Sequence, residues 1–222
     1  MNDNYYKDLW TKPDKEGTKF FYKVDFNSHE YRLQEHIFRE FLKSLKRLQR
    51  EEDSNIIPPI ETVLEVGAGT GRMTKIVLEE FPNIIKYDCV ELNFNEEKIR
   101  QTITSEYMRK TTWYNLDITS EEFELVFQQY DPLRTYDLIL GSEIFMHIKP
   151  DDLGPVITKL VKLVAPDHGL IVNLDWYHNY PPEKSDWCFI HDYHKLYTTN
   201  GLTPIFTRDM IEIKQKLFCY GR

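Results

Sequence analysis

Hydrophobic and polar positions divide the chain into a first part with one long helical pattern and a second part of shorter, alternating patterns. From His29 to about Gln49, apolar residues recur at helical spacing, which predicts an amphipathic helix that Ser28 can cap. Ile57–Pro59 ends this pattern. Residues 1–28 are rich in aromatic side chains without a regular period, so we expect an arm that packs over part of the domain.

From residue 62 onward, short apolar runs typical of buried strands alternate with helical patterns. The predicted strands are Thr62–Val66, Tyr87–Leu92, Thr112–Leu116, Asp137–Leu140, Gly169–Leu174, Thr203–Arg208 and Ile211–Tyr220. The predicted helices are Met73–Phe81, Asn95–Glu106, Glu121–Gln129, Leu153–Val164 and His191–Asn200. This alternation predicts an α/β fold in which a parallel sheet carries helices on both faces. Ligands of such sheets bind beyond the carboxyl ends of the strands, where the strand order reverses.

Length and charge limit the domain organisation and the partners. The 222 residues can bury one sizeable core, and we divide them into the arm, residues 1–28, and one domain, residues 29–222. Within that domain, residues from about 176 to 200 are expected to form an insertion on the acceptor side. A net charge of −8 disfavours a nucleic-acid partner, because phosphate binding needs clustered Lys and Arg. The basic cluster Arg39–Arg50 is followed at once by acidic residues and is interpreted as a solvated helix face.

Signals of cellular location are few. No apolar run is long enough to span a membrane, and the N-terminal residues lack the features of a secretory signal. The three cysteines, Cys89, Cys188 and Cys219, are widely spaced and form neither a disulfide framework nor a metal motif. A reducing cytoplasm fits this cysteine usage, and the oligomeric state stays open.

The strongest local signal is the run LEVGAGTGR, residues 64–72, between a predicted strand and a predicted helix. Its three glycines allow a tight turn and close approach of the backbone to a ligand. A dinucleotide-binding fingerprint has a small residue at its sixth position, whereas this run has Arg72. Glu65 precedes the first glycine by two residues, and it would repel a pyrophosphate but suit a cationic amino-acid group. The run therefore argues against NAD.

Further polar residues follow the next three strands. Glu91 ends the second predicted strand, where a carboxylate can accept hydrogen bonds from both hydroxyls of a ribose. Asp117, in the run NLDI, ends the third strand and can accept a hydrogen bond from an adenine amino group. The fourth strand belongs to the run YDLILGSEIFMH, residues 136–147, and its polar end opens toward the same expected pocket.

In order and spacing, these runs resemble the motifs of the class I S-adenosylmethionine-dependent methyltransferases over about residues 60–175. The resemblance implies a Rossmann-like, doubly wound, mostly parallel seven-stranded sheet with an antiparallel final strand. It also implies binding of S-adenosylmethionine, with the ribose at Glu91, the adenine at Asp117 and Ile118, and the two ends of the methionine portion at Glu65 and Arg72. The other residues that it implies for the cofactor are Gly67, Ala68, Gly69, Leu92 and Ser142.

Residues for the methyl acceptor are expected after the fourth and fifth strands. His147 is the preferred general base because imidazole titrates near neutrality, and Glu143 is the alternative. Transfer by positioning alone, without a base, also stays open. A carboxylate among aromatic rings suits an amine or a planar acceptor. The acceptor-binding residues that we expect are Asp175, Trp176, Tyr177, His178 and, from the arm, Tyr22.

The acceptor itself is not identified. Motifs of DNA adenine and cytosine methyltransferases are absent, which favours a small molecule over nucleic acid. A protein or RNA acceptor stays open, since the run GAGTGR with an Asp after the fifth strand also resembles protein α-N-terminal methyltransferases. A cofactor-binding module without methyl transfer, or a related aminopropyltransferase, is the third alternative. The histidines near residue 191 match no metal-binding spacing, so no metal is expected.

Overall fold

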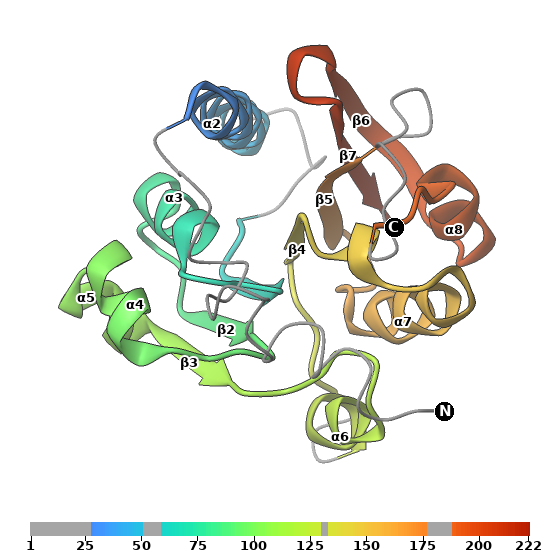
Figure 1. Ribbon diagram of the computed structural model, residues 1–222, viewed down its shortest axis with the longest axis horizontal. Helices are drawn as coiled ribbons and strands as arrows, with labels where there is room; N and C mark the ends of the chain where they lie inside the picture. The colour runs from blue at the N-terminus through green and yellow to red at the C-terminus, as the bar shows by residue number, and fades with distance from the viewer. Residues whose placement is uncertain (1–27, 51–58, 130–132, 177–187) are drawn as a thin grey trace, which may run out of the picture.

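The computed structural model describes residues 28–50, 59–129, 133–176 and 188–222. Its strands form one seven-stranded sheet in the order β3-β2-β1-β4-β5-β7-β6 (Figure 1). The strands are β1 (Thr62–Val66), β2 (Lys86–Val90), β3 (Thr111–Tyr114), β4 (Leu138–Ser142), β5 (Leu170–Trp176), β6 (Thr203–Met210) and β7 (Gln215–Gly221). Strand β7 is antiparallel to both of its neighbours, and the pairings among β1 to β5 are all parallel. This arrangement confirms the predicted fold class.

The strand order reverses at β1, which places a ligand-binding position at its carboxyl end. Val63 of β1 pairs with Tyr87 of β2 on one side and with Leu138 of β4 on the other. The chain leaves β1 toward one neighbour and returns from β3 to the opposite side. Connections that start from this point diverge, so the carboxyl ends of β1, β2 and β4 surround an open crevice.

Helices cover both faces of the sheet (Figure 1). They are α2 (His29–Arg50), α3 (Arg72–Glu80), α4 (Glu96–Thr102), α5 (Ser105–Lys110), α6 (Glu121–Glu124), α7 (Pro150–Leu163) and α8 (Tyr193–Thr199). Alternate residues of the strands enter two separate cores, because side chains of a strand point to opposite faces. Val63 faces the core formed by α2 and α3, and its neighbour Leu64 faces the core formed by α6, α7 and α8.

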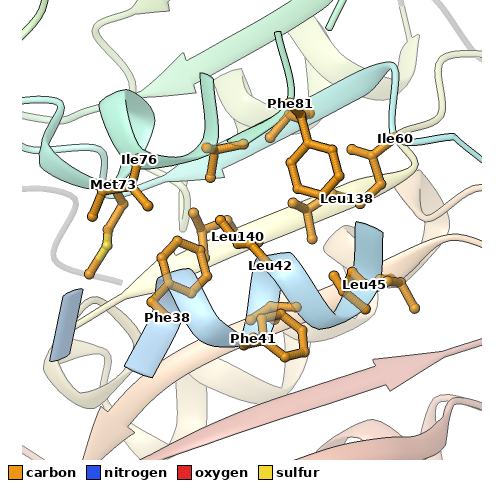
Figure 2. Close-up of a cluster of buried hydrophobic side chains, with 14 of the residues drawn as sticks. Phe38, Phe41, Leu42, Leu45, Ile60, Met73, Ile76, Phe81, Leu138 and Leu140 are labelled. Carbon is orange, nitrogen blue, oxygen red and sulfur yellow. The ribbon is translucent and has the colours of Figure 1, made fainter. Parts of the chain in front are cut away.

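Helix α2 joins the domain through its apolar face. Figure 2 shows its side chains gathered with those of α3 over strand β4; the labelled residues include Phe38, Phe41, Leu42, Leu45, Met73, Ile76, Leu138 and Leu140. Phe38 and Leu42 are fully buried. Burial of such side chains contributes about 1.5–3 kcal/mol each, so α2 is an integral layer of the fold. None of the described helices combines the length and the apolar composition that a membrane crossing requires.

Two predicted elements differ from the structure. The helix predicted at Asn95–Glu106 is wrong, since α4 ends at Thr102 and a new helix, α5, begins at Ser105. Thr104 separates them because its side chain accepts a hydrogen bond from the backbone N–H of Tyr107 and caps α5. The strand predicted from Ile211 begins only at Gln215, after a 3₁₀ turn that closes the β6–β7 hairpin.

Part of the predicted organisation lies outside the described residues. Of the expected arm, residues 1–28, the structure describes only Ser28. Of the expected insertion, about 176 to 200, it describes residue 176 and residues 188–200, which include α8.

Candidate active site

A cavity of about 230 Å³ lies at the carboxyl ends of β1, β2 and β4. Most residues that the sequence singles out line it: Glu65, Gly67, Ala68, Gly69, Arg72, Glu91, Leu92, Asp117, Ile118, Ser142, Glu143, His147 and Trp176. The topology therefore brings together side chains from five strand ends and the glycine-rich turn. Tyr22, Tyr177 and His178 lie outside the described residues.

The glycine-rich turn is held by the backbone of the neighbouring strand. The N–H groups of Gly67 and Ala68 both donate to the carbonyl oxygen of Val90, at 2.9 and 3.2 Å. Gly67 has a φ of 66°, and a Cβ atom there would lie 2.8 Å from side-chain atoms of Ile144. Only glycine combines this conformation with this contact, so the turn passes directly under the residues that follow β4.

Glu91 ties the same turn to the end of β2. One of its carboxylate oxygens accepts from the backbone N–H of Gly69 and the other from that of Asn93, each at 2.8 Å. Burial raises the pKa of Glu91, and these two hydrogen bonds offset part of the rise. The side chain thus shapes the cavity wall as well as contributing a carboxylate to it.

Glu65 is a buried carboxyl group on β1. Its Oε2 accepts hydrogen bonds from the Thr74 hydroxyl and the Tyr87 hydroxyl, each at 2.6 Å. Burial raises its pKa to about 7, against the effect of these hydrogen bonds and of Arg72. A carboxyl group with this pKa exchanges its proton near neutral pH, and a cationic ligand beside it would favour the ionised form.

Two further strand ends supply polar atoms. The Oδ1 of Asp117 accepts from the backbone N–H and the hydroxyl of Thr119, at 2.8 and 2.7 Å, which fixes the carboxylate after β3. At the end of β4, the hydroxyl oxygen of Ser142 is buried and has no hydrogen-bond partner among the described residues. A buried hydroxyl without a partner is costly, so this atom marks a position where a polar ligand atom would be stabilised.

A ring of polar side chains from four elements closes one side of the cavity. The Nη2 of Arg72 donates to Gln34 of α2, whose amide donates to Gln215 of β7 at 2.7 Å. The amide of Gln215 in turn donates to Oε1 of Glu143 at 2.6 Å. The ring closes where Nη2 of Arg72 lies 4.0 Å from Oε2 of Glu143. Helix α2 and strand β7 thereby position the two charged groups.

Glu143 occupies an unusual backbone conformation. Its φ of 54° lies in the left-handed region, which residues other than glycine rarely adopt. The backbone at Glu143 is therefore strained. Its N–H donates to the carbonyl oxygen of Leu174 at 2.8 Å, so strand β5 holds this conformation. Burial raises the pKa of Glu143, while Arg72 and hydrogen bonds from Gln215 and Tyr31 offset part of the rise.

The 3₁₀ turn η3 (Phe145–His147) carries the predicted base. His147 is 5% exposed, and its Nδ1 lies 3.4 Å from the sulfur of Cys188, which orients the ring. Asp175 lies beneath this turn. Its side chain is fully buried and does not line the cavity. Its carboxylate accepts hydrogen bonds from the backbone N–H of Met146 at 3.4 Å and from the side-chain amide of Asn173 at 3.2 Å. The structure thus buries Asp175 beneath the turn and outside the cavity lining, and its contact with an acceptor stays a prediction.

Three residues that sequence reasoning missed complete the site. Tyr31 lines the cavity, and the guanidinium carbon of Arg72 lies 4.8 Å from the centre of its ring. Gln34 and Gln215 bond each other across 181 positions of sequence. The helical pattern of α2 places Tyr31 and Gln34 on one helix, but no local motif indicates their partners.

Comparison with known proteins agrees with this geometry. A family model described as a methyltransferase domain matches residues 64–170. Phosphoethanolamine N-methyltransferase 1 from Triticum aestivum is 25% identical over 140 residues, which cover 61% of this chain and 26% of that protein. A hybrid PKS-NRPS synthetase from Penicillium citrinum is 29% identical over 115 residues, or 51% of this chain and 3% of that protein. The chain therefore spans about a quarter or less of the length of these curated relatives.

Solved structures that share this fold include methyltransferases. The N-methyltransferase NodS from Bradyrhizobium japonicum WM9, in complex with S-adenosylhomocysteine, has a TM-score of 0.59 and 16% identity, and the match covers 99% of each chain. Magnesium protoporphyrin IX methyltransferase from Synechocystis PCC 6803, with bound S-adenosylmethionine, has a TM-score of 0.56 and 13% identity, with 98% of this chain and 91% of that chain covered. By its motifs and the matching family model, the segment of residues 64–170 is similar to a methyltransferase domain, and the strand order gives the chain the fold of these solved structures.

Proposed function

We propose that the protein binds S-adenosylmethionine in this cavity and transfers its methyl group to a small-molecule acceptor. The observation that carries the proposal is the hydrogen bond between the glycine-rich turn and Glu91, from Gly69 N–H at 2.8 Å. This hydrogen bond places the turn, which suits an amino-acid group, next to a carboxylate that suits a ribose. A ligand in which a nucleoside is joined to an amino acid needs both of these binding positions.

The other residues of the wall fit the same ligand. Glu65 would hold the amino group and Arg72 the carboxylate of the methionine portion. Asp117 would accept from the adenine amino group and Ile118 would pack on the ring. The hydroxyl of Ser142, which has no hydrogen-bond partner among the described residues, would add a polar atom near the methionine end. This set suits a cationic nucleoside better than a pyrophosphate, which Glu65 would repel.

When bound, S-adenosylmethionine supplies a methyl group on a positively charged sulfur atom that leaves as a neutral thioether. The protein then has to place the acceptor in line with the methyl carbon, exclude water and accept a proton where the acceptor carries one. His147 is the candidate for the last task, because η3 holds its ring in the cavity wall and the contact with Cys188 orients it.

The remaining parts of the proposal concern partners and location. A net charge of −8 supports a small molecule or a peptide over nucleic acid as the acceptor. We further propose a cytoplasmic location, which the lack of a disulfide among Cys89, Cys188 and Cys219 supports. Within the described residues, no group of His, Cys, Asp or Glu is arranged to hold a metal ion, and the proposed chemistry requires none.

Calorimetric titration tests the cofactor directly. S-adenosylmethionine and S-adenosylhomocysteine should both bind, whereas NAD should give no detectable heat. Tight binding of NAD, or no binding of S-adenosylhomocysteine, would contradict the proposal. A screen of acceptor pools with isotopically labelled methyl donor then tests transfer, and its products report the acceptor.

A further inference from the structure

The charges of the cavity wall are unbalanced. Among the described residues, four carboxyl groups line it, those of Glu65, Glu91, Asp117 and Glu143, against the single guanidinium group of Arg72. The proposed binding of S-adenosylmethionine assigns the first three to its amino group, ribose and adenine. Glu143, which also lines the cavity, is left without a partner in that ligand.

Arg72 does not neutralise Glu143. Its Nη2 donates to Gln34 and lies 4.0 Å from Glu143, which is the outer limit of an ion pair. Its Nη1 lies 3.6 Å from the carboxylate of Glu35, so two carboxylates share one guanidinium group. The proposed function also gives Arg72 the carboxylate of the methionine portion. Arg72 therefore offsets the charge of Glu143 only in part, and a cation beside Glu143 would favour its ionised form against the effect of burial.

The fold holds Glu143 in a strained backbone conformation. Its left-handed backbone conformation, with a φ of 54°, is strained, and such strain persists where the surrounding structure imposes it. Gln215 donates to Oε1 at 2.6 Å, and 23% of the side chain is exposed. The carboxylate is thus fixed from one side and accessible from another. The aromatic residue Trp176 also lines the cavity, and aromatic rings attract organic cations.

We propose that Glu143 anchors the ammonium group of an amine acceptor, which makes this site that of an N-methyltransferase. The inference rests on the proposed methyl transfer and names its substrate class. An ammonium group beside a sulfonium is repelled, and a carboxylate next to both removes that repulsion. A carboxylate acceptor would instead be repelled by Glu143.

The reaction balances with the groups at hand. The bound ammonium gives one proton to Glu143 or His147, and the freed lone pair of its nitrogen forms the new N–C bond. The bond from the methyl carbon to sulfur breaks at the same time, and sulfur keeps its electron pair as a neutral thioether. The methylated amine carries the positive charge away, and the accepted proton passes to solvent.

Binding measurements with matched probes test the head group without relying on turnover. With S-adenosylhomocysteine bound, the protein is titrated with benzylamine, benzyl alcohol and benzoate, and separately with ethanolamine, ethylene glycol and glycolate. Within each set the probes share a carbon skeleton and differ in the head group. We expect the amine to bind at least about tenfold more tightly than the alcohol, the scale of one charge-assisted hydrogen bond, and the carboxylate not at all.

Two variants separate an anchoring role from a general electrostatic effect. Glu143→Gln should weaken amine binding about tenfold or more and leave the binding of S-adenosylhomocysteine within about twofold. Glu35→Gln is the matched control, because Glu35 interacts with the same guanidinium group but does not line the cavity. It should leave the preference for amines unchanged. Thermal unfolding of both variants checks that the fold is retained.

The outcomes distinguish the two proposals. If S-adenosylhomocysteine binds but amines bind no better than alcohols, or if both Gln variants weaken amine binding equally, the amine anchor is wrong and the proposed function stands. If labelled methyl groups appear only on hydroxyl or carboxylate acceptors, the same conclusion holds. If S-adenosylhomocysteine does not bind at all, the proposed function fails, and the inference with it.

Discussion

The cavity has two halves that the chain builds in different ways. We define a proposed cofactor half, which comprises Glu65, Gly67, Ala68, Gly69, Glu91 and Asp117, and a proposed acceptor half, which comprises Tyr31, Glu143, His147 and Trp176. In the cofactor half, contacts join residues close in sequence: Glu65 to Thr74 across 9 positions and Gly69 to Glu91 across 22. In the acceptor half, Gln215 bonds Glu143 across 72 positions and Gln34 across 181.

This difference separates the proposed binding of the cofactor from the proposed binding of the acceptor. Three consecutive strand ends between residues 65 and 117 form the cofactor half, and it contacts α2 through the hydrogen bond from Arg72 to Gln34. The acceptor half depends on α2 and β7, which lie at opposite ends of the described chain. We therefore expect changes in α2 or β7 to alter the choice of acceptor more than the binding of the cofactor. Substitutions in the cofactor half should change the dissociation constant of the cofactor and leave turnover nearly unchanged. Substitutions in the acceptor half should do the reverse.

The largest expected effect is that of His147→Ala. Loss of a general base lowers turnover by about 100- to 10,000-fold, and the affinity for S-adenosylhomocysteine should stay within about twofold. Steady-state kinetics with the identified acceptor, alongside calorimetry, measures both. Near-full turnover at saturating acceptor would show that His147 is structural. Proton removal would then fall to Glu143, or positioning alone would suffice.

Glu91→Ala should have the opposite signature. It removes a carboxylate that would bind the ribose and that holds the backbone N–H of Gly69, so cofactor binding should weaken by ~2–3 kcal/mol. Turnover at saturating cofactor should change far less. Glu91→Gln should restore only part of the affinity, because the amide nitrogen must face the N–H of either Gly69 or Asn93. An unchanged dissociation constant for S-adenosylhomocysteine in the Ala variant would exclude the ribose role.

The sequence was sufficient to predict most of the fold, because the apolar runs of the central strands are short, buried and bounded by turns. The observed β1 coincides with the predicted Thr62–Val66, and β4 and β5 begin one residue after their predictions. The cofactor half is equally accessible to prediction. Its polar residues belong to short runs of sequence at strand ends, and parallel strands bring those ends to one edge of the sheet.

The acceptor half was much less accessible. Nothing in the sequence near Gln34 or Gln215 indicates that their amides meet, since only the folded sheet and α2 bring them together. Asp175 shows the same limit, because its place after β5 suggests an acceptor contact, whereas the turn at Met146 draws its carboxylate inward. The break at Thr104 is a different case, since a capping threonine inside a helical pattern is a local signal that periodicity alone overlooks.

Asp175, which does not line the cavity, tests whether the cofactor half and the acceptor half are independent. Asp175→Ala removes the acceptor of the Met146 N–H beneath His147, so turnover should fall about tenfold, the equivalent of one hydrogen bond. The KM for the acceptor should rise less than turnover falls, and S-adenosylhomocysteine should bind as before. Asp175→Asn keeps a carbonyl oxygen for Met146 and should restore most of the turnover. If the Asn variant is as impaired as the Ala variant, or if cofactor affinity falls in step, Asp175 stabilises the whole fold and does not position η3.

The smallest effect, and the one confined to the cofactor half, is a pH dependence from Glu65. Burial raises its pKa from the ordinary 4.5 to about 7, and the cationic amino group of a bound cofactor would favour the ionised form. Affinity for S-adenosylhomocysteine should therefore rise about threefold between about pH 6.5 and 7.5 and then level off. The stability of the free protein should move the other way. Between pH 4.5 and about 7 the folded state holds a proton that the unfolded state has lost, so this contribution to stability is complete below 4.5 and is lost as pH rises through about 7.

Glu65→Gln isolates this titration, because its amide oxygen can still accept from Thr74 and Tyr87 while no proton is exchanged. The variant should bind S-adenosylhomocysteine with a flatter pH profile than the unmodified protein, and turnover at saturating cofactor should change little. Calorimetry across this pH range, paired with thermal unfolding at each pH, measures both trends. A variant that keeps the full pH slope would assign it to another buried carboxyl group. Glu143 is the first to examine, and a slope due to Glu143 would show that the two halves of the cavity are coupled through Arg72.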